Sequence, residues 1–412
     1  MKILLYGINF APELTGIGKY TGEMAAWLAA RGHTVRVVTA PPYYPAWQVS
    51  AGFNARHYTT EVWQGVTVYR APLWVPRQPG GLKRLLHLAS FALASLPVLL
   101  RQWRWRPDVV WVVEPPLFCA PAAVALAGLT GAKAWLHVQD YEVDAAFDLG
   151  LLKGVLLRRW VAAGERWLMQ RFDRVSTISG RMLDLARSKG VDAARLVLFP
   201  NWVDISAIQP LVEPSPYRAE LGIAADAVVA LYSGNMGGKQ GLEVLADAAV
   251  LLQTLPQVQF VLCGGGAGRA DLVARCQGLP NVRFLDLQPM ERLGDLLGLA
   301  DIHLLPQRAD AADLVMPSKL TGMLASGRAV VATAHANTEL GRVVSTHCGL
   351  IVPPEDGAAL AEAICTLSAN PQQRAALGMA ARAYAEKELD KNAVLGRFEV
   401  ALQELTAFSG HP

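Results

Sequence analysis

Short apolar runs alternate along the first half of the chain with stretches in which apolar residues recur at helical spacing. The runs predict strands at residues 3–8, 34–39, 109–113, 134–138, 174–178 and 196–199. Helical spacing predicts helices at residues 20–30 and 181–189, with an alanine-rich helix between 113 and 134. Strands that alternate with helices in this way predict a parallel sheet with right-handed crossovers.

The same alternation returns after residues 205–226, a stretch without period that holds three prolines and is interpreted as a linker. Strands are predicted at residues 228–233, 259–263, 282–285, 302–305, 329–333 and 349–352, and the tail from residue 356 onward has mostly helical spacing. The pattern predicts an α/β protein with two Rossmann-like, doubly wound parallel-sheet domains. We place these domains at residues 1–204 and 205–390, followed by a helical segment at 391–412.

Two segments interrupt the alternation, and the first is an aromatic, proline-rich stretch at residues 41–63. A long loop inside a compact domain is often functional. The alternative is a surface loop that its own aromatic side chains hold in place. The sequence leaves both interpretations open.

The second segment is residues 81–106, whose apolar centre at 85–100 is shorter than the roughly 20 residues that span a bilayer. Basic and tryptophan residues flank this centre, among them Lys83, Arg84, Arg101, Trp103 and Arg104. Arginine and tryptophan beside an apolar helix are typical of contact with an anionic membrane surface. We therefore favour peripheral membrane contact over a buried helix with a solvated basic end.

Composition narrows the class of protein. Of 412 residues, 52% are hydrophobic, and the formal net charge of +3 is too small to indicate nucleic acid as a partner. The five cysteines include no C-x-x-C pair, so we expect reduced thiols rather than a zinc site or a disulfide framework. The apolar run that follows Met1 and Lys2 is too short for a signal peptide, which predicts a cytoplasmic protein.

Two glycine-rich segments follow predicted first strands of the two halves. Gly16 and Gly18 lie between the first strand and its helix, where backbone N–H groups approach an oxygen-rich ligand or form a plain tight turn. The spacing is not G-x-G-x-x-G, which argues against NAD. In the second half, the SGNMGGKQG segment at 233–241 surrounds Lys239 with glycines, and we favour phosphate binding there over a structural turn.

Three further positions are candidates for the same ligand. Ser318 and Lys319 open a predicted helix, as a cap and as a positive charge for a diphosphate, although simple capping explains them equally. Gly264 and Gln288 follow strands on the same predicted edge of the sheet, where ordinary connecting loops are the alternative.

In the first half, His137 ends a predicted strand, and Asp140, Glu142 and Asp144 follow it. A lone histidine at a strand end is more often structural, but one beside several carboxylates is a better site candidate. The chain has no D-x-D and no His/Cys cluster with metal-ligand spacing. We therefore expect no metal or other cofactor, and a diphosphate would be neutralised by cations of the protein.

Together these segments resemble the retaining GT-B glycosyltransferases of family 4 over nearly the whole chain. The markers are the Gly16/Gly18 loop and the segments ARGHTVRVVT, STISGRM, FPNWVD and SKLTGMLASGRAVVAT, of which the last is the most specific. The SGNMGGKQGLE and MPSKL segments are similar to the subgroup that builds bacterial exopolysaccharide and O-antigen repeat units, such as those of colanic acid.

The resemblance implies two domains that face a central cleft and a final helix that crosses back to the first domain. It implies transfer of a sugar, with retention, from a GDP- or UDP-linked donor to an undecaprenyl-diphosphate-linked sugar at the inner face of the cytoplasmic membrane. For the nearest subgroup the donor would be GDP-fucose. The resemblance places His137 and Asp140 at the reaction centre.

The chain departs from the family at its charged positions. Asn235 stands at the family's loop arginine, and Gln240 stands at its loop lysine, one place after Lys239. The family's glutamate pair falls on Leu314 and Gly322. We expect Lys319 to supply the missing charge and Asp313 to replace the carboxylate that holds the sugar hydroxyls. A sugar-nucleotide epimerase and a non-catalytic sugar-binding protein stay open as alternatives, and the basic, tryptophan-bearing segment at 81–106 argues against the epimerase.

Overall fold

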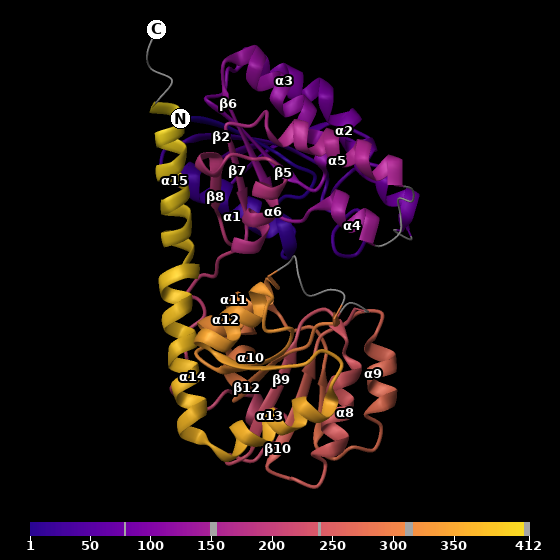
Figure 1. Cartoon of the computed structure of the whole chain (residues 1–412), viewed down its shortest axis with the longest axis vertical. Helices are drawn as coiled ribbons and strands as arrows, with labels where there is room; N and C mark the ends of the chain where they lie inside the picture. The colour runs from indigo at the N-terminus through magenta and orange to yellow at the C-terminus, as the bar shows by residue number, and fades with distance from the viewer. Residues whose placement is uncertain (78–79, 149–154, 238–239, 310–315, 408–412) are drawn as a thin grey trace. The chain divides into compact units, whose positions relative to one another are not determined.

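The computed structural model describes residues 1–77, 80–148, 155–237, 240–309 and 316–407. The chain divides into two compact units, shown in Figure 1: Met1–Pro200 together with Leu395–Pro412, and Asn201–Val394. Each unit holds one sheet that is covered by helices. The predicted α/β class with two Rossmann-like sheets is confirmed.

The first unit has an eight-stranded sheet with the order β3-β4-β2-β1-β5-β6-β7-β8. Every neighbouring pair is parallel except β3 and β4. The strands are β1 Lys2–Tyr6, β2 Thr34–Thr39, β3 Thr59–Trp63, β4 Val66–Arg70, β5 Val109–Glu114, β6 Lys133–Val138, β7 Arg174–Thr177 and β8 Leu196–Leu198.

The antiparallel pair corrects the interpretation of residues 41–63 as one long loop. The last five of these residues form β3, which a two-residue turn joins to β4. Both turn residues have positive φ, 45° at Gln64 and 80° at Gly65, which is the backbone of a type I′ hairpin turn. The signal was the alternation in TTEVW and VTVYR around Gln64-Gly65.

Helices cover both faces of this sheet. They are α1 Gly16–Ala30, α2 Gly81–Arg101, α3 Ala120–Thr130, α4 Glu142–Asp148, α5 Val155–Met169 and α6 Gly180–Ser188. Buried side chains of α2, α3, α5 and α6 form one core cluster with alternate residues of the strands, such as Leu136 of β6. Because successive strand residues face opposite sides, these four helices lie on one face of the sheet.

The end of the chain contacts the opposite face. Within α15, Lys391–Ala407, Phe398 meets Trp135 with ring centroids 5.0 Å apart. Glu399 of the same helix accepts hydrogen bonds from Arg31 and His33 at 2.7 and 2.8 Å. Trp135 precedes Leu136 in β6, so the side chains of these two residues point to opposite sides of the sheet.

The second unit has a six-stranded, wholly parallel sheet with the order β11-β10-β9-β12-β13-β14. The strands are β9 Val228–Ser233, β10 Val258–Cys263, β11 Val282–Leu285, β12 Ile302–Leu305, β13 Ala329–Thr333 and β14 Gly349–Val352, each within one residue of its predicted range. The helices are α7 Tyr217–Glu220, α8 Glu243–Leu251, α9 Arg269–Arg275, α10 Leu293–Leu299, α11 Lys319–Ala325, α12 Glu339–His347, α13 Gly357–Ala369 and α14 Pro371–Tyr384.

The sheet order places β9 in the middle of this unit, with β10 on one side and β12 on the other. Chain order therefore reverses at β9, and the loops that leave the carboxyl ends of these strands meet at one edge. In open α/β sheets, ligands bind at such a switch point.

Candidate functional site

Two glycine loops lie against each other at the carboxyl edge of the second sheet. Gly234 follows β9 with φ of 138°, and Gly264 follows β10 with φ of 141°. A Cβ on Gly264 would lie 1.9 Å from the carbonyl oxygen of Gly234, so a side chain does not fit there. The N–H of Met236 donates to the carbonyl of Gly265 at 2.8 Å, which ties the loops together. Bare backbone at this edge allows the close approach of a ligand.

Lys319 lies beneath the first of these loops. Its side chain comes within 3.4 Å of the Cβ position on Gly234, and its Nζ is 4.3 Å from the centroid of the Tyr232 ring. The Nζ is buried and has no hydrogen-bond acceptor among the described residues. Burial lowers the pKa of this ammonium from 10.5 to about 8. A buried ammonium without an anion is costly, and a bound phosphate would satisfy it.

Two buried amide oxygens on neighbouring loops also lack partners. Gln240 Oε1 and Gln307 Oε1 make no hydrogen bond within the described part of the chain. Gln307 lies two residues after the end of β12, and its backbone N–H donates to Thr333 Oγ1 at 2.8 Å. Most buried polar groups in proteins are hydrogen-bonded, so several unsatisfied atoms at one sheet edge indicate a missing ligand or water.

The remaining predicted donor residues of this unit differ in their surroundings. Asn235 is exposed, and its Oδ1 would be 2.7 Å from a Cβ on Gly266. Gln288 is already hydrogen-bonded, since its Oε1 accepts from the Tyr217 hydroxyl at 2.8 Å. Ser318 is exposed and occupies the N-cap position of α11 without a side-chain cap bond, so the predicted capping does not occur. Lys239 and Asp313 lie outside the described residues.

Sequence reasoning missed Arg308, which lies on the loop that follows β12. Its backbone N is 3.5 Å from the Cβ position on Gly241, so the two loops touch. Its guanidinium is 3.9 Å from Glu355, with a side chain that is 42% exposed. The available signal was an arginine three residues beyond a predicted strand end, at the same edge as Lys319.

In the first unit, the glycines at the start of α1 contact a carboxylate. The helix begins at Gly16 rather than at residue 20 as predicted, so Gly16 and Gly18 belong to its first turn. A Cβ on Gly18 would lie 2.4 Å from Glu13 Oε2. Glu13 also accepts hydrogen bonds from the N–H groups of Tyr43 and Tyr44, both at 3.0 Å. The packing of Glu13 therefore explains why glycine is required at position 18. A role of Gly18 in donor binding stays a prediction.

Glu13 is itself largely buried, and desolvation raises its pKa. Arg70 reinforces the same region from β4 because its guanidinium donates to the backbone carbonyls of Ala11 and Ala40 at 2.7 and 2.8 Å. The hydrogen bonds from Tyr43 and Tyr44 to Glu13 fasten part of the 41–63 segment to the turn after β1.

His137 lies in an aromatic enclosure at the carboxyl end of β6. Its ring stacks on Trp111 with centroids 5.3 Å apart and meets Phe199 edge-on at 5.1 Å. One ring nitrogen is 2.9 Å from Ser176 Oγ, and the other is 3.0 Å from the amide nitrogen of Gln139. Burial lowers its pKa to about 3, so the ring is neutral at physiological pH. These contacts are those of a histidine that packs in the core. A catalytic role of His137 stays a prediction.

Asp140 follows β6 and is half-buried. Near it lies an acidic cluster with Lys189, in which Glu114 and Glu165 are buried and Glu142 and Asp144 are half-buried. The Lys189 ammonium is 2.5 Å from Glu165 and 2.6 Å from Asp144. Desolvation raises the pKa of Glu114 well above its usual value, and the nearby Glu165 and Glu142 raise it further. Among the described residues, no group of three or more His, Cys, Asp or Glu side chains is arranged to hold a metal ion.

The predicted membrane residues surround α2. Lys83, Arg101 and Arg104 are exposed, Arg84 is half-buried, and Trp103 is 52% exposed. The segment Gly81–Arg104 is long and apolar enough to cross a membrane by length and composition alone. However, Phe91 and Leu99 on its inner side belong to the core cluster of the first unit. The helix therefore packs on the sheet with one side and exposes the other.

Two Rossmann-like units, one of which carries a glycine-lined sheet edge with a buried cation, define the class of GT-B glycosyltransferases. Sequence comparison agrees: residues 15–202 match the family described as "Glycosyl transferase 4-like domain", and residues 227–370 match "Glycosyl transferases group 1". The chain is 47% identical over 407 residues to WcaI of Escherichia coli (strain K12), named as a colanic acid biosynthesis glycosyl transferase, covering 97% of this chain and 98% of that one. The chain belongs to this glycosyltransferase family and is an enzyme.

Other relatives are more distant. The chain is 25% identical over 420 residues to the D-inositol 3-phosphate glycosyltransferase of Kineococcus radiotolerans, covering 92% of this chain and 89% of that one. Among solved structures, sucrose-phosphate synthase from Thermosynechococcus elongatus superposes with a TM-score of 0.76 at 18% identity, covering 99% of each chain. Anabaena HepE in complex with UDP-glucose superposes with a TM-score of 0.69 at 18% identity, covering 98% of this chain and 100% of that one. At such identity the solved structures support the fold alone.

Proposed function

We propose that the enzyme transfers a sugar from a nucleotide-sugar donor to a lipid-linked saccharide in the assembly of a bacterial exopolysaccharide of the colanic acid type. The relative from Escherichia coli is named for colanic acid biosynthesis, and it aligns with nearly the whole chain. The finer assignment is transfer of fucose from GDP-fucose, with retention, to an undecaprenyl-diphosphate-linked sugar. The enzyme would act from the cytoplasm at the inner face of the membrane.

The observation that carries the donor assignment is the buried ammonium of Lys319, which has no hydrogen-bond acceptor among the described residues. It lies under Gly234, where bare backbone leaves room for an oxygen-rich group. A donor diphosphate in this place would gain a charge-assisted hydrogen bond from the ammonium. Arg308, on the adjoining loop, would add a second positive charge to the same edge. Asn235, Gly264, Gln288 and Ser318 would border the nucleotide, and no metal or other cofactor is required.

On the acceptor side, we assign Asp140 to the reaction centre because it is a half-buried carboxylate two residues after the end of β6. His137 would act through position rather than by proton transfer. Its ring is neutral and fills the core behind the end of β6, three residues before Asp140. The exposed basic residues and Trp103 of the α2 region would hold the enzyme at the membrane that carries the acceptor.

The test is a transfer assay with the full-length protein. Radiolabelled GDP-fucose, and in parallel other GDP- and UDP-linked sugars, are supplied with undecaprenyl-diphosphate-glucose in vesicles, and lipid-linked products are separated and counted. We expect incorporation from one donor class, and an anomeric configuration in the product that matches the donor. Lys319→Ala is expected to abolish most of the incorporation, whereas the exposed control Lys387→Ala leaves it intact. No transfer and no nucleotide binding with any donor would contradict the proposal.

A further inference from the structure

The outer side of α5 exposes two large aromatic side chains, which are unusual on a surface that contacts only water. Trp160 is 77% exposed and Trp167 is 58% exposed. The two are seven residues apart, or two helical turns, so they lie on the same face of α5, with the exposed Ala163 between them. Tryptophan with this exposure is typical of binding surfaces and of the headgroup level of membranes.

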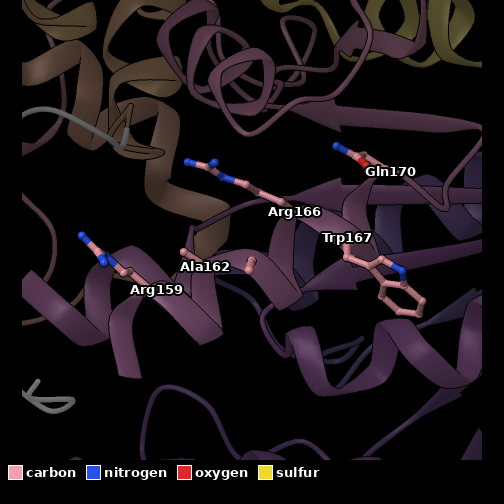
Figure 2. Close-up of a pocket in the computed structure, with 6 residues that line it drawn as sticks. Arg159, Ala162, Arg166, Trp167 and Gln170 are labelled. Carbon is pink, nitrogen blue, oxygen red and sulfur yellow. The ribbon is translucent and has the colours of Figure 1, made fainter. Parts of the chain in front are cut away.

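The same helix carries two arginines beside the tryptophans. Arg159 and Arg166 are also two turns apart, and both line a hollow of about 380 Å³ together with Ala162, Trp167 and Gln170. Figure 2 shows the side chains of these residues. Among the described residues, neither guanidinium has a hydrogen bond or an ion pair, although the charge of Arg166 acts on Glu165, where burial raises the pKa of the carboxyl and Arg166 partly offsets that rise. Small residues between the two guanidinium groups leave space for an anion of phosphate size.

The charge around the hollow has one sign. The single acidic residue of α5, Glu165, is 2% exposed and is paired with Lys189 on the inner side. A neighbouring hollow shares Gln170 and is lined by further cations, with Asp173 as its acidic member: Lys133, Arg171, Arg174 and Arg195. Asp173 lies 3.8 Å from Lys133. Positive side chains therefore continue beyond the end of the helix toward α15, whose Leu405 also lines this second hollow.

The adjoining helices place this surface in a wider apolar layer. α2, α3 and α5 cover the same face of the first sheet, and Figure 1 shows them together. The outer side of α2 exposes Leu86, Leu93 and Leu100 at 51%, 68% and 54%, each two turns from the next. Leu129 of α3 is 64% exposed. Apolar stripes with basic borders match an anionic bilayer surface. The phosphate backbone of a nucleic acid would leave these leucines without an apolar partner.

We propose that the outer face of α5 is a second membrane-binding element, in which Arg159 and Arg166 hold the phosphate groups of anionic phospholipids and Trp160 and Trp167 lie at headgroup level. The α2 region supplies the first element in the proposed function. Membrane contacts at both α2 and α5 would hold the first unit in a fixed orientation on the membrane. A single contact would let the unit rotate about it, whereas two separated contacts restrict that rotation. The effective concentration of the second element is high once the first is bound.

The test measures binding of the full chain to vesicles by co-sedimentation. Vesicles of phosphatidylcholine alone are compared with vesicles that also contain phosphatidylglycerol. The α5 variants are Arg159→Gln with Arg166→Gln, and Trp160→Ala with Trp167→Ala. The α2 variant is Arg101→Gln with Arg104→Gln. Arg275→Gln, an exposed arginine on α9 of the second unit, is the matched control. Thermal unfolding of each variant serves to check that it is folded.

We expect binding to anionic vesicles to weaken about fivefold for each α5 arginine removed, since one basic residue near an anionic surface contributes about 1 kcal/mol. The tryptophan pair should weaken binding to both kinds of vesicle, and the control should change neither. Wild-type affinity in both folded α5 variants would overturn the inference. If only the α2 variant loses binding, the inference fails and the membrane contact of the proposed function stands. Tighter binding of the α5 surface to a DNA oligonucleotide than to anionic vesicles would also overturn it.

Discussion

The ammonium of Lys319 lies 4.3 Å from the centroid of the Tyr232 ring and has no hydrogen-bond acceptor among the described residues. The ring face attracts the cation but does not replace the hydrogen bonds that water would make. The arrangement therefore holds a positive charge in a desolvated place beside exposed backbone at Gly234.

Replacing Lys319 with methionine should separate stability from binding. Removal of this buried charge, which has no acceptor among the described residues, should stabilise the unliganded protein by at most about 3 kcal/mol, because the lowered pKa of about 8 measures the cost of that charge. The same change should weaken nucleoside diphosphate binding roughly 10- to 100-fold, the usual loss for a charged hydrogen bond. Thermal unfolding with and without GDP or UDP measures both effects. Lys387→Met is the exposed control, and a variant that loses stability but keeps its affinity would remove Lys319 from the site.

Nucleotide affinity should depend on pH through Lys319. Its pKa is lowered from 10.5 to about 8, so the free enzyme loses the ammonium as pH rises past that value. Affinity for a nucleoside diphosphate should fall above pH 8, up to about tenfold per unit. Between pH 8 and 10.5 the unfolded chain holds a proton that the folded chain has released, so this group contributes increasing stability with rising pH. Titration calorimetry from pH 7 to 9.5 measures the affinity, and Lys319→Arg should abolish the dependence in that range.

Gly18 should matter for stability rather than for donor binding. A Cβ there would lie 2.4 Å from Glu13 Oε2, and Glu13 also holds the N–H groups of Tyr43 and Tyr44. Gly18→Ala should therefore cost about 1–3 kcal/mol in the free energy of unfolding. The matched control is Gly128→Ala in α3, where a Cβ meets nothing and alanine should stabilise the helix by about 0.5–1 kcal/mol. Unchanged stability with weakened nucleotide binding would instead support the phosphate role predicted from sequence.

Acid should destabilise the protein through His137. Burial lowers its pKa from 6.5 to about 3, so between these values the unfolded chain binds a proton that the folded chain does not. The contribution is absent above about pH 7 and grows as pH falls, reaching about 2 kcal/mol of lost stability at pH 5. His303, with a pKa also lowered to about 3, should act in the same direction in the second unit.

Urea unfolding of wild type and His137→Gln at pH 7 and pH 5 measures this difference. The loss on acidification should be smaller in the variant, whatever its stability at pH 7. The pH profile of sugar transfer is a separate readout: a wild-type pKa near 6.5 that vanishes in His137→Gln would show that the ring titrates and would contradict its neutral, positioning role.

The sequence determined the fold class because the signal is local. Two rounds of alternating strand and helix patterns predict two doubly wound sheets, and five of the six strands in the second unit match their predicted ranges fully. The hairpin at Gln64 and Gly65 was missed although its signal is also local, since proline and aromatic residues upstream suggested a loop. Period and turn chemistry act between near neighbours, so sequence alone carries them.

Only the tertiary structure decided what surrounds each candidate side chain. Nothing in the spacing of residues shows that Glu13 fills the space beside Gly18, or that Trp111 and Phe199 enclose His137. Likewise, Lys319 lies under Gly234 because the start of α11 meets the loop after β9 at the edge of the sheet. In the chain, 84 positions lie between these two residues. Burial, desolvation and missing partners depend on contacts between distant segments. They set the charge of a lysine or a histidine, and they arise only when the chain is folded.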